Sequence, residues 1–379
     1  MQTDKEGFLY PVVDAETCID CGLCEKVCPV INQLDPQRPL KVYAAYNNNE
    51  DIRMQSSSGG IFTLLAEETI KKGGVVFGVK FNKDWMPEFA YAENIEGIVP
   101  FRGSKYVQAI VGNAYKNVEE FLKSGRDVLF CGTPCQIAGL KRYLRKEYDN
   151  LLTVDFICHG VPSPGVWKRY LEETIIGLYN KIKDSTETIG KENTYIENIS
   201  FRNKSFGWKN FSFVLTLSAL TKSGEKKTIS LCQKFHENIF MKGFLADLYL
   251  RPSCYQCPTK NIKSGSDITI ADFWKIEDVI PEIHDVEKGV SSLLLNTMKG
   301  LNYFEIIKTS VDFWESDLEY VCKYNKALYS SSVKPIKRIE FYDKILNNEI
   351  ISTIEKITKR SLFSKIKNRI IRYLKIIKK

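Results

Sequence analysis

The pattern of apolar and polar positions predicts alternating strands and helices from residue 41 onward. Short apolar runs next to glycine or polar residues predict buried strands, and apolar residues three or four positions apart predict helices. The expected strands are 42–46, 75–79, 128–130 and 152–158, and the expected helices are 60–72, 136–144 and 165–178. Alternation over residues 196–217 predicts a hairpin. Because these signals interleave without a clean βαβ repeat, we expect an α/β fold of mixed elements with some antiparallel pairing.

A group of four cysteines stands near the start of the chain. Residues 18–29 read Cys-Ile-Asp-Cys-Gly-Leu-Cys-Glu-Lys-Val-Cys-Pro, which is the spacing of a bacterial ferredoxin cluster site. The candidate ligands of a 4Fe-4S cluster are Cys18, Cys21, Cys24 and Cys28. Structural zinc is the alternative, because cysteine pairs also suit tetrahedral zinc, although this spacing is not that of a zinc ribbon.

The last cysteine of this motif has two interpretations. In two-cluster ferredoxins it ligates the other cluster, yet no cysteine precedes Cys18. Either Cys28 completes a single cluster, or the segment belongs to a ferredoxin domain that is N-terminally incomplete. The sequence Gly7-Phe-Leu-Tyr-Pro resembles the middle of such a domain and favours the second interpretation.

The remaining composition favours the reducing interior of a cell. No apolar leader follows Met1, and no apolar run approaches the ~18–20 residues that a membrane-spanning helix needs. We therefore expect a cytoplasmic protein. In that compartment the 11 cysteines are expected to be metal ligands or redox groups rather than disulfides.

A second group of cysteines is spread over the body of the chain. Cys254 and Cys257 have the Cys-x2-Cys spacing of two ligands to one metal centre, which needs two further ligands from elsewhere in the chain. Cys135 and Cys158 each follow a predicted strand and precede a turn, so both are expected at one edge of a sheet. The alternative, which the spacing leaves open, is that Cys131 and Cys158 are small buried apolar residues.

Six motifs in a fixed order resemble those of the coenzyme F420 hydrogenase/dehydrogenase beta-subunit family, especially its bacterial members with a ferredoxin domain in front. The resemblance covers about residues 7–300. The motifs are Ser56-Ser-Ser-Gly-Gly-Ile-Phe, Gly103-Ser-Lys-Tyr-Val-Gln, Phe130-Cys-Gly-Thr-Pro-Cys-Gln-Ile-Ala-Gly-Leu, Cys158-His-Gly-Val-Pro-Ser, Cys254-Tyr-Gln-Cys-Pro and Ser266-Asp-Ile-Thr-Ile-Ala-Asp-Phe-Trp.

The resemblance implies an iron–sulfur flavoprotein that binds FAD and a 4Fe-4S cluster in its body. The implied ligands of that cluster are Cys135, Cys158, Cys254 and Cys257, with Cys131 a dispensable neighbour. The candidate flavin contacts are Ser57, Ser58, Gly59, Gly60, Lys105, Gly132 and Thr133.

The flavin assignments of residues 57–60 and of Lys105 each have an ordinary alternative. Residues 57–60 precede a predicted helix, whose N–H groups suit a diphosphate, but a plain N-cap explains serine there as well. Lys105 is either a phosphate or flavin partner or a surface lysine. The sequence also departs from the family pattern, because Ala271 and Lys275 stand near Trp274 where glycines are usual.

The expected function is that of an oxidoreductase passing electrons between 4Fe-4S clusters and FAD, to or from a small-molecule acceptor. The resemblance suggests surface-polysaccharide biosynthesis. The alternatives are an electron-carrier subunit serving a redox partner protein, and a zinc-stabilised scaffold at the membrane surface. The expected domains are 1–35 (ferredoxin-type), 40–310 (FAD and 4Fe-4S body), 311–355 (helical extension) and 356–379 (basic amphipathic tail).

The net charge of +8 is located in the tail. Residues 356–379 hold ten Lys or Arg and no acid, whereas the rest of the chain has a net charge of −2. Apolar residues at helical spacing among these lysines predict a basic amphipathic helix. Such a helix suits binding to the anionic inner face of the cell membrane, and packing against the body of the protein is the alternative. Nucleic acid is not expected as a partner, because the body is slightly acidic.

Overall fold

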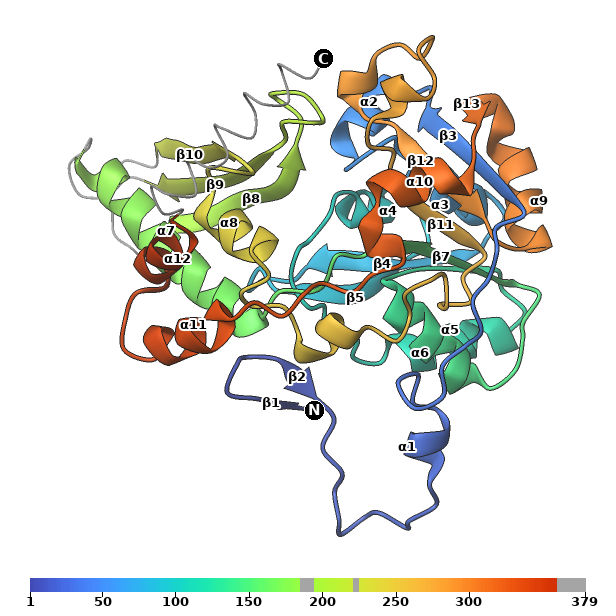
Figure 1. Cartoon of the computed structure of the whole chain (residues 1–379), viewed down its shortest axis with the longest axis horizontal. Helices are drawn as coiled ribbons and strands as arrows, with labels where there is room; N and C mark the ends of the chain where they lie inside the picture. The colour runs from blue at the N-terminus through green and yellow to red at the C-terminus, as the bar shows by residue number, and fades with distance from the viewer. Residues whose placement is uncertain (185–193, 221–224, 360–379) are drawn as a thin grey trace, which may run out of the picture.

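An eight-stranded mixed sheet organises most of the chain and lies beside a smaller three-stranded sheet (Figure 1). This computed structural model describes residues 1–184, 194–220 and 225–359. Within those ranges, no helix has both the length and the apolar character that crossing a membrane requires.

The large sheet contains four parallel strands in its centre and antiparallel strands at both sides. Its order is β13-β3-β12-β11-β7-β6-β4-β5, and β11, β7, β6 and β4 are the parallel members. The carboxyl ends of the parallel strands meet at one edge of the sheet, where open α/β sheets bind ligands. The strands are β3 (Lys41–Asn47), β4 (Val75–Phe81), β5 (Pro87–Ala92), β6 (Val128–Cys131), β7 (Leu151–Phe156), β11 (Ile268–Asp272), β12 (Ser291–Leu295) and β13 (Val311–Glu315).

Helices cover both faces of the large sheet. Alternate residues of each strand point to opposite faces, so Leu129 of β6 packs in one core cluster and Phe130 in another. The first cluster includes residues of α3 (Ile61–Lys71), α4 (Ile95–Ile98) and α9 (Met298–Ile307). The second includes α5 (Ala114–Lys123) and α6 (Pro134–Leu144), and a third on β3 and β12 includes α10 (Leu318–Tyr324).

The small sheet has its own aromatic core. Its antiparallel strands are β8 (Thr194–Asn203), β9 (Ser212–Leu220) and β10 (Lys226–Lys234). Trp167 is fully buried there, with its ring centroid 5.0 Å from that of Phe201 and 5.0 Å from that of Phe240. The surrounding helices are α7 (Pro164–Asp184), α8 (Ile239–Leu245), α11 (Lys337–Ile345) and α12 (Ile350–Thr358).

The N-terminal segment is anchored to the body at both of its ends and bows away between them (Figure 1). The hairpin of β1 (Gln2–Thr3) and β2 (Leu9–Tyr10) precedes α1 (Leu23–Lys26). Phe8 is fully buried, and Glu6 is ion-paired with Arg338 of α11. At the other end, Arg142 donates a hydrogen bond to the carbonyl oxygen of Gln33 (3.3 Å).

The elements predicted from the sequence are confirmed with small shifts of their ends. The main difference is α7, which begins at Pro164 and extends to Asp184, well past the predicted end at residue 178. The tail assigned to 356–379 lies mostly outside the described residues, since α12 ends at Thr358. The remaining helical elements are α2 (Glu50–Gln55) and the 3-10 turns η1 (Val99–Phe101), η3 (Pro252–Gln256), η4 (Ile276–Asp278), η5 (Val286–Lys288), η6 (Lys308–Ser310) and η7 (Lys326–Leu328).

Candidate functional site

Four cysteines meet at the edge of the large sheet where its parallel strands end. Cys135 lies in the first turn of α6, just after β6, and Cys158 follows β7. Cys254 lies in η3 and Cys257 directly after it. Each of the six pairs among these thiols interacts electrostatically. Cysteines far apart in the sequence are therefore brought to one place.

The protein around Cys135, Cys158 and Cys254 opposes the ionisation of their thiols in the absence of a partner. Burial raises the pKa of Cys254 to about 12, and repulsion from the other thiols adds to the effect. Burial also raises the pKa of Cys158. Cys135 reaches solvent, yet the protein packed around it raises its pKa as well. Thiolates are stable here only with a compensating positive charge, which an iron–sulfur cluster supplies to its ligands.

Hydroxyl groups and cations surround the same cysteines. Thr133 Oγ1 lies 3.2 Å from Cys135 Sγ, and Thr259 Oγ1 lies 3.3 Å from Cys257 Sγ. Arg251 lowers the pKa of both Cys135 and Cys254, although burial outweighs it. Hydrogen bonds to cluster sulfur and nearby charge are the means by which a protein sets the reduction potential of a cluster.

Cys131 lies outside this group. It is the last residue of β6, and its electrostatic partners are Lys105 and Asp155 rather than the other cysteines. Burial raises its pKa to about 12. The surroundings of Cys131 therefore differ from those of Cys135.

The ferredoxin motif lies on the part of the N-terminal segment that bows away from the body. Cys18, Cys21 and Cys24 are exposed, and Cys28 is half-buried. Asn32 Nδ2 donates to the carbonyl oxygens of Glu25 (2.7 Å) and Lys26 (3.2 Å), which closes the turn after α1. The evidence that these four cysteines bind a cluster is therefore mainly their spacing in the sequence.

The serine–glycine loop, residues 57–60, leads into α3 without a side-chain cap. Gly60 is the N-cap residue, with φ of +84°. The Ser58 hydroxyl donates to the carbonyl oxygen of Val290 (2.8 Å), and Ser57 Oγ lies 2.8 Å from Ser104 Oγ. The N-cap of α3 is thus Gly60 and not one of the serines. The N-terminal N–H groups of α3 have no serine side chain to satisfy them.

Lys105 and Arg202 lie beside this loop. Lys105 is half-buried, its Nζ donates to the carbonyl oxygen of Arg102 (3.1 Å), and burial lowers its pKa to about 7. It is thus not an ordinary surface lysine. Arg202 of β8 binds both oxygens of Asp272 (2.8 and 2.9 Å) and donates to the carbonyl oxygen of Ser57 (3.0 Å).

Gly132 and Thr133 join β6 to α6. Thr133 caps α6 in a capping box with Gln136, which fixes the position of Cys135. A Cβ at Gly132 would lie 3.2 Å from a side-chain atom of Gln136. Both residues are accordingly placed between Cys131 and Cys135.

Several residues of the site carry no signal in the sequence. Arg251, Lys260 and Ser331 lie in loops without a motif, and only the folded chain brings them to the cysteines. Lys260 Nζ donates to the carbonyl oxygen of Cys158 (2.7 Å), and Ser331 Oγ accepts from the N–H of Cys257 (2.9 Å). Lys275, which stands where the family pattern has a glycine, adopts a φ of +61°. The backbone shape that a glycine favours is thus present despite the side chain.

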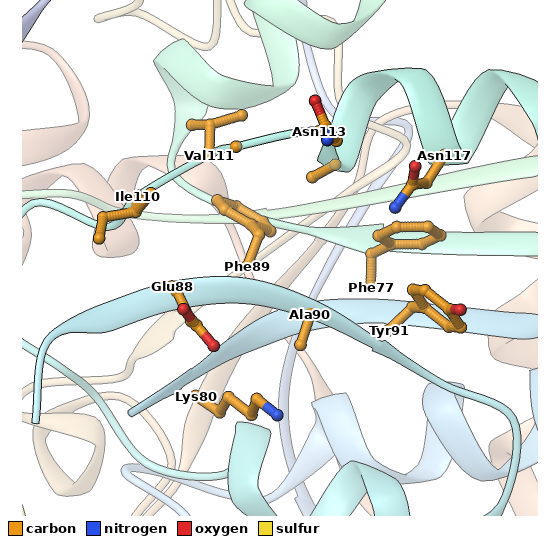
Figure 2. Close-up of a pocket in the computed structure, with 12 residues that line it drawn as sticks. Phe77, Lys80, Glu88, Phe89, Ala90, Tyr91, Ile110, Val111, Asn113 and Asn117 are labelled. Atoms are coloured by element: carbon orange, nitrogen blue, oxygen red, sulfur yellow. The ribbon is translucent and has the colours of Figure 1, made fainter. Parts of the chain in front are cut away.

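The described residues hold no compact site for a single metal ion. No three Cys, His, Asp or Glu side chains among them converge on a point that one ion would occupy; a cubane differs in binding each cysteine through a separate iron. A cavity of about 350 Å³ lies between β5 and the start of α5, with Phe77, Phe89 and Tyr91 in its wall (Figure 2). None of its lining residues is a cysteine or belongs to the serine–glycine loop.

The fold and the site define an α/β protein with a four-cysteine centre in its body and a ferredoxin motif in front. A sequence model for the C terminus of the coenzyme F420 hydrogenase/dehydrogenase beta subunit matches residues 125–319, and one for its N-terminal part matches residues 42–115. The chain belongs to this family of oxidoreductase subunits. A model of the 4Fe-4S binding domain matches residues 9–30, which supports the cluster motif.

Two known proteins from methanogens are similar to this chain. The F subunit of the F(420)H(2) dehydrogenase of Methanosarcina mazei is 26% identical over 147 residues, which is 38% of this chain and 41% of the relative. The chain thus matches less than half of that protein's length. A chain from a structure of the F420-reducing [NiFe] hydrogenase complex of Methanosarcina barkeri has a TM-score of 0.47 and 15% identity, covering 82% of this chain and 92% of that one.

Proposed function

We propose that this protein is an iron–sulfur flavoprotein that passes electrons between 4Fe-4S clusters and FAD. The observation that carries the proposal is the meeting of Cys135, Cys158, Cys254 and Cys257 at the edge of the sheet. These residues would hold the body cluster, and Cys18, Cys21, Cys24 and Cys28 would hold the front cluster. Electrons would enter at the front. The clusters supply one-electron transfer, and a flavin supplies exchange between one- and two-electron chemistry.

The serine–glycine loop supports the FAD part of the proposal. Ser57, Ser58, Gly59 and Gly60 stand at the N-terminus of an 11-residue helix, where N–H groups and the helix dipole favour a diphosphate. A Cβ at Gly59 would lie 2.5 Å from the carbonyl oxygen of Ala45, so only glycine fits there. Lys105, Gly132 and Thr133 are the further flavin contacts of the proposed site.

The final electron acceptor defines two versions of the function. In the first, the protein is an oxidoreductase that acts on a small molecule, such as a precursor of surface polysaccharide. In the second, it is an electron-carrier subunit that serves a partner enzyme; the similar protein of Methanosarcina mazei is named as a subunit of a dehydrogenase. Turnover of a small acceptor by the isolated, reduced chain would support the first version, and turnover only with an added partner enzyme would support the second.

The proposed domains keep the boundaries expected from the sequence. Residues 1–35 would form the front iron–sulfur unit, 40–310 the flavin and cluster body, and 311–355 an extension that is helical only after β13 (Val311–Glu315), which belongs to the large sheet of the body. Limited proteolysis tests this division. Cleavage near residues 32–39 that leaves the body cluster intact would support it, and loss of both clusters on that cleavage would contradict it.

The basic tail supports a further proposal, peripheral contact with an anionic membrane through residues 356–379. Ten basic side chains without an acid provide the charge for it. Deleting these residues should abolish sedimentation with vesicles that contain an anionic phospholipid. Unchanged sedimentation after the deletion would exclude the tail as a membrane contact.

A further inference from the structure

Lys204 is a buried lysine whose ammonium group contacts only carbonyl oxygens. Its side chain follows β8 and is 4% exposed. Its Nζ donates to the carbonyl oxygens of Arg53 (2.6 Å), Ser58 (2.7 Å) and Lys288 (2.6 Å). One side chain from the small sheet thus ties together the end of α2, the serine–glycine loop and the turn before β12.

The charge of Lys204 has no carboxylate partner in the described part of the chain. Its electrostatic neighbours are Arg202 of β8, Arg53 of α2 and Asp272 of β11. Asp272 is engaged by Arg202, and Arg53 donates to the carbonyl oxygens of Gly289 and Asp285 (both 2.8 Å). Arg53 interacts in turn with the carboxylates of Asp285, Glu50 and Asp312. Lys204 itself has Asp272 as its carboxylate neighbour, against the two guanidinium groups of Arg202 and Arg53. An unpaired buried cation is costly, so this surplus favours a site that receives an anion.

The carbonyl contacts also fix which way the loop's N–H groups face. In a trans peptide unit the C=O and the following N–H point in opposite directions. The carbonyl of Ser57 points to Arg202 (3.0 Å), so the N–H of Ser58 faces away from Arg202. The carbonyl of Ser58 points to Lys204 (2.7 Å), and the N–H that follows it, that of Gly59, donates to Ser291 Oγ (2.9 Å). The carbonyl of Gly59 accepts from the N–H of Asn47 (2.8 Å), so the N–H of Gly60 also faces the other way. The N–H groups of Ser58 and Gly60 therefore have no acceptor among the described residues, and the peptide that Lys204 holds lies between them.

We propose that Lys204 is a positioning residue that orients the serine–glycine loop for the diphosphate of the flavin nucleotide, and that its positive charge stabilises the bound anion. This inference rests on the proposed function, because it assigns the loop to FAD. It adds a residue from outside all six family motifs. Lys204 acts through the carbonyl group of Ser58 in the loop and those of Arg53 and Lys288 beside it, since its three donor contacts are already made within the protein.

The pKa of Lys204 gives this role a signature. Burial, with the neighbouring Arg202 and Arg53, lowers its pKa to about 7. A bound anion favours the charged form, so FAD binding at pH 8 should be accompanied by proton uptake at Lys204. A side chain that only braces the fold would show no such uptake.

The experiment compares FAD with riboflavin, which lacks the diphosphate. Flavin is removed from the purified full-length protein, and the affinity of each flavin is measured for the wild type and for Lys204→Met. We expect a loss of roughly tenfold or more for FAD, no change for riboflavin, and reduced proton uptake at pH 8 by calorimetry in two buffers. Lys204→Gln, which keeps a donor without the charge, should behave in the same way and serves if Lys204→Met does not fold.

Lys209→Met is the matched control. Lys209 also follows β8, but it is ion-paired with Glu277 and lies 3.6 Å from Glu287, so its loss should leave both affinities unchanged. If Lys204→Met lost affinity for FAD and for riboflavin equally, Lys204 would have only a structural role, and the proposal would be overturned. Unchanged FAD affinity would overturn it as well. A wild type that binds no FAD at all would instead contradict the proposed function itself.

Discussion

Arg251 joins the N-terminal segment to the cysteine centre of the body through a hydrogen bond to Leu9. Its Nη1 donates to the carbonyl oxygen of Leu9 at 3.0 Å, and its guanidinium lies 4.1 Å from the centre of the Tyr10 ring. The same charge partly offsets the burial that raises the pKa of Cys135 and Cys254. The front segment and the proposed body cluster therefore share one cation.

Replacing Arg251 by Met should lower the reduction potential of the body cluster. A lost positive charge makes the added electron less favourable, and the body cluster should become harder to reduce by tens of millivolts. A potentiometric titration followed by EPR measures the shift. Arg142→Met is the control, because Arg142 holds the other end of the front segment at Gln33. A potential unchanged in Arg251→Met, or shifted equally in both variants, would contradict the assignment.

Single cysteine replacements should distinguish the body cysteines that bind the cluster from those that do not. Cys135→Ser and Cys257→Ser should each remove roughly one cluster's iron, because a missing thiolate opens the cubane. Cys131→Ser, Cys232→Ser and Cys322→Ser should retain it. Iron and sulfide analysis of anaerobically purified variants is the measurement. Loss of iron in Cys131→Ser together with its retention in Cys135→Ser would reverse the assignment.

Gly59→Ala should weaken flavin binding. The added Cβ would lie 2.5 Å from the carbonyl oxygen of Ala45 and 2.9 Å from the backbone nitrogen of Ser291, so the loop must shift. Equilibrium dialysis of FAD should show the loss. Gly177→Ala in α7 is the control, since its Cβ would meet nothing within 4 Å and alanine is favoured over glycine by ~1 kcal/mol in a helix. Equal FAD affinity in Gly59→Ala and the wild type would exclude the loop from the flavin site.

Asp155 should make stability depend on pH near neutrality. Burial raises its pKa from 3.8 to about 6, although hydrogen bonds from Ser264 and Thr269 oppose the rise. The folded state therefore holds this proton more tightly than the unfolded state. The resulting stabilisation is complete below pH 3.8 and is lost as the pH rises through 6, a change of about 3 kcal/mol.

Asp155→Asn removes this titration. As the pH rises from about 5 to about 7.5, the wild type should therefore lose thermal stability relative to Asp155→Asn. Thermal unfolding of both proteins across this range is the measurement. Parallel curves for the two proteins would show that Asp155 does not titrate there.

The sequence predicts the secondary-structure elements more directly than it predicts the proposed cluster ligands. Strand β6 and helix α6 follow from local apolar patterns, and Cys18 to Cys28 follow from spacing alone. Cys135 and Cys254 are 119 positions apart, so their spacing does not indicate whether they bind the same cluster. Only the resemblance to the family motifs suggests that they do. Lys204 and Arg251 carry no local signal. Their roles depend on carbonyl groups that long-range folding brings to them.

The measurement that tests the central claim most directly is the cofactor content of the anaerobically purified full-length chain. Iron, acid-labile sulfide, zinc and flavin are counted per chain in the wild type and in Cys135→Ser. The account predicts iron and sulfide for two 4Fe-4S clusters and one FAD in the wild type, with about half of the iron lost in the variant. Zinc without iron, sulfide or flavin would contradict it.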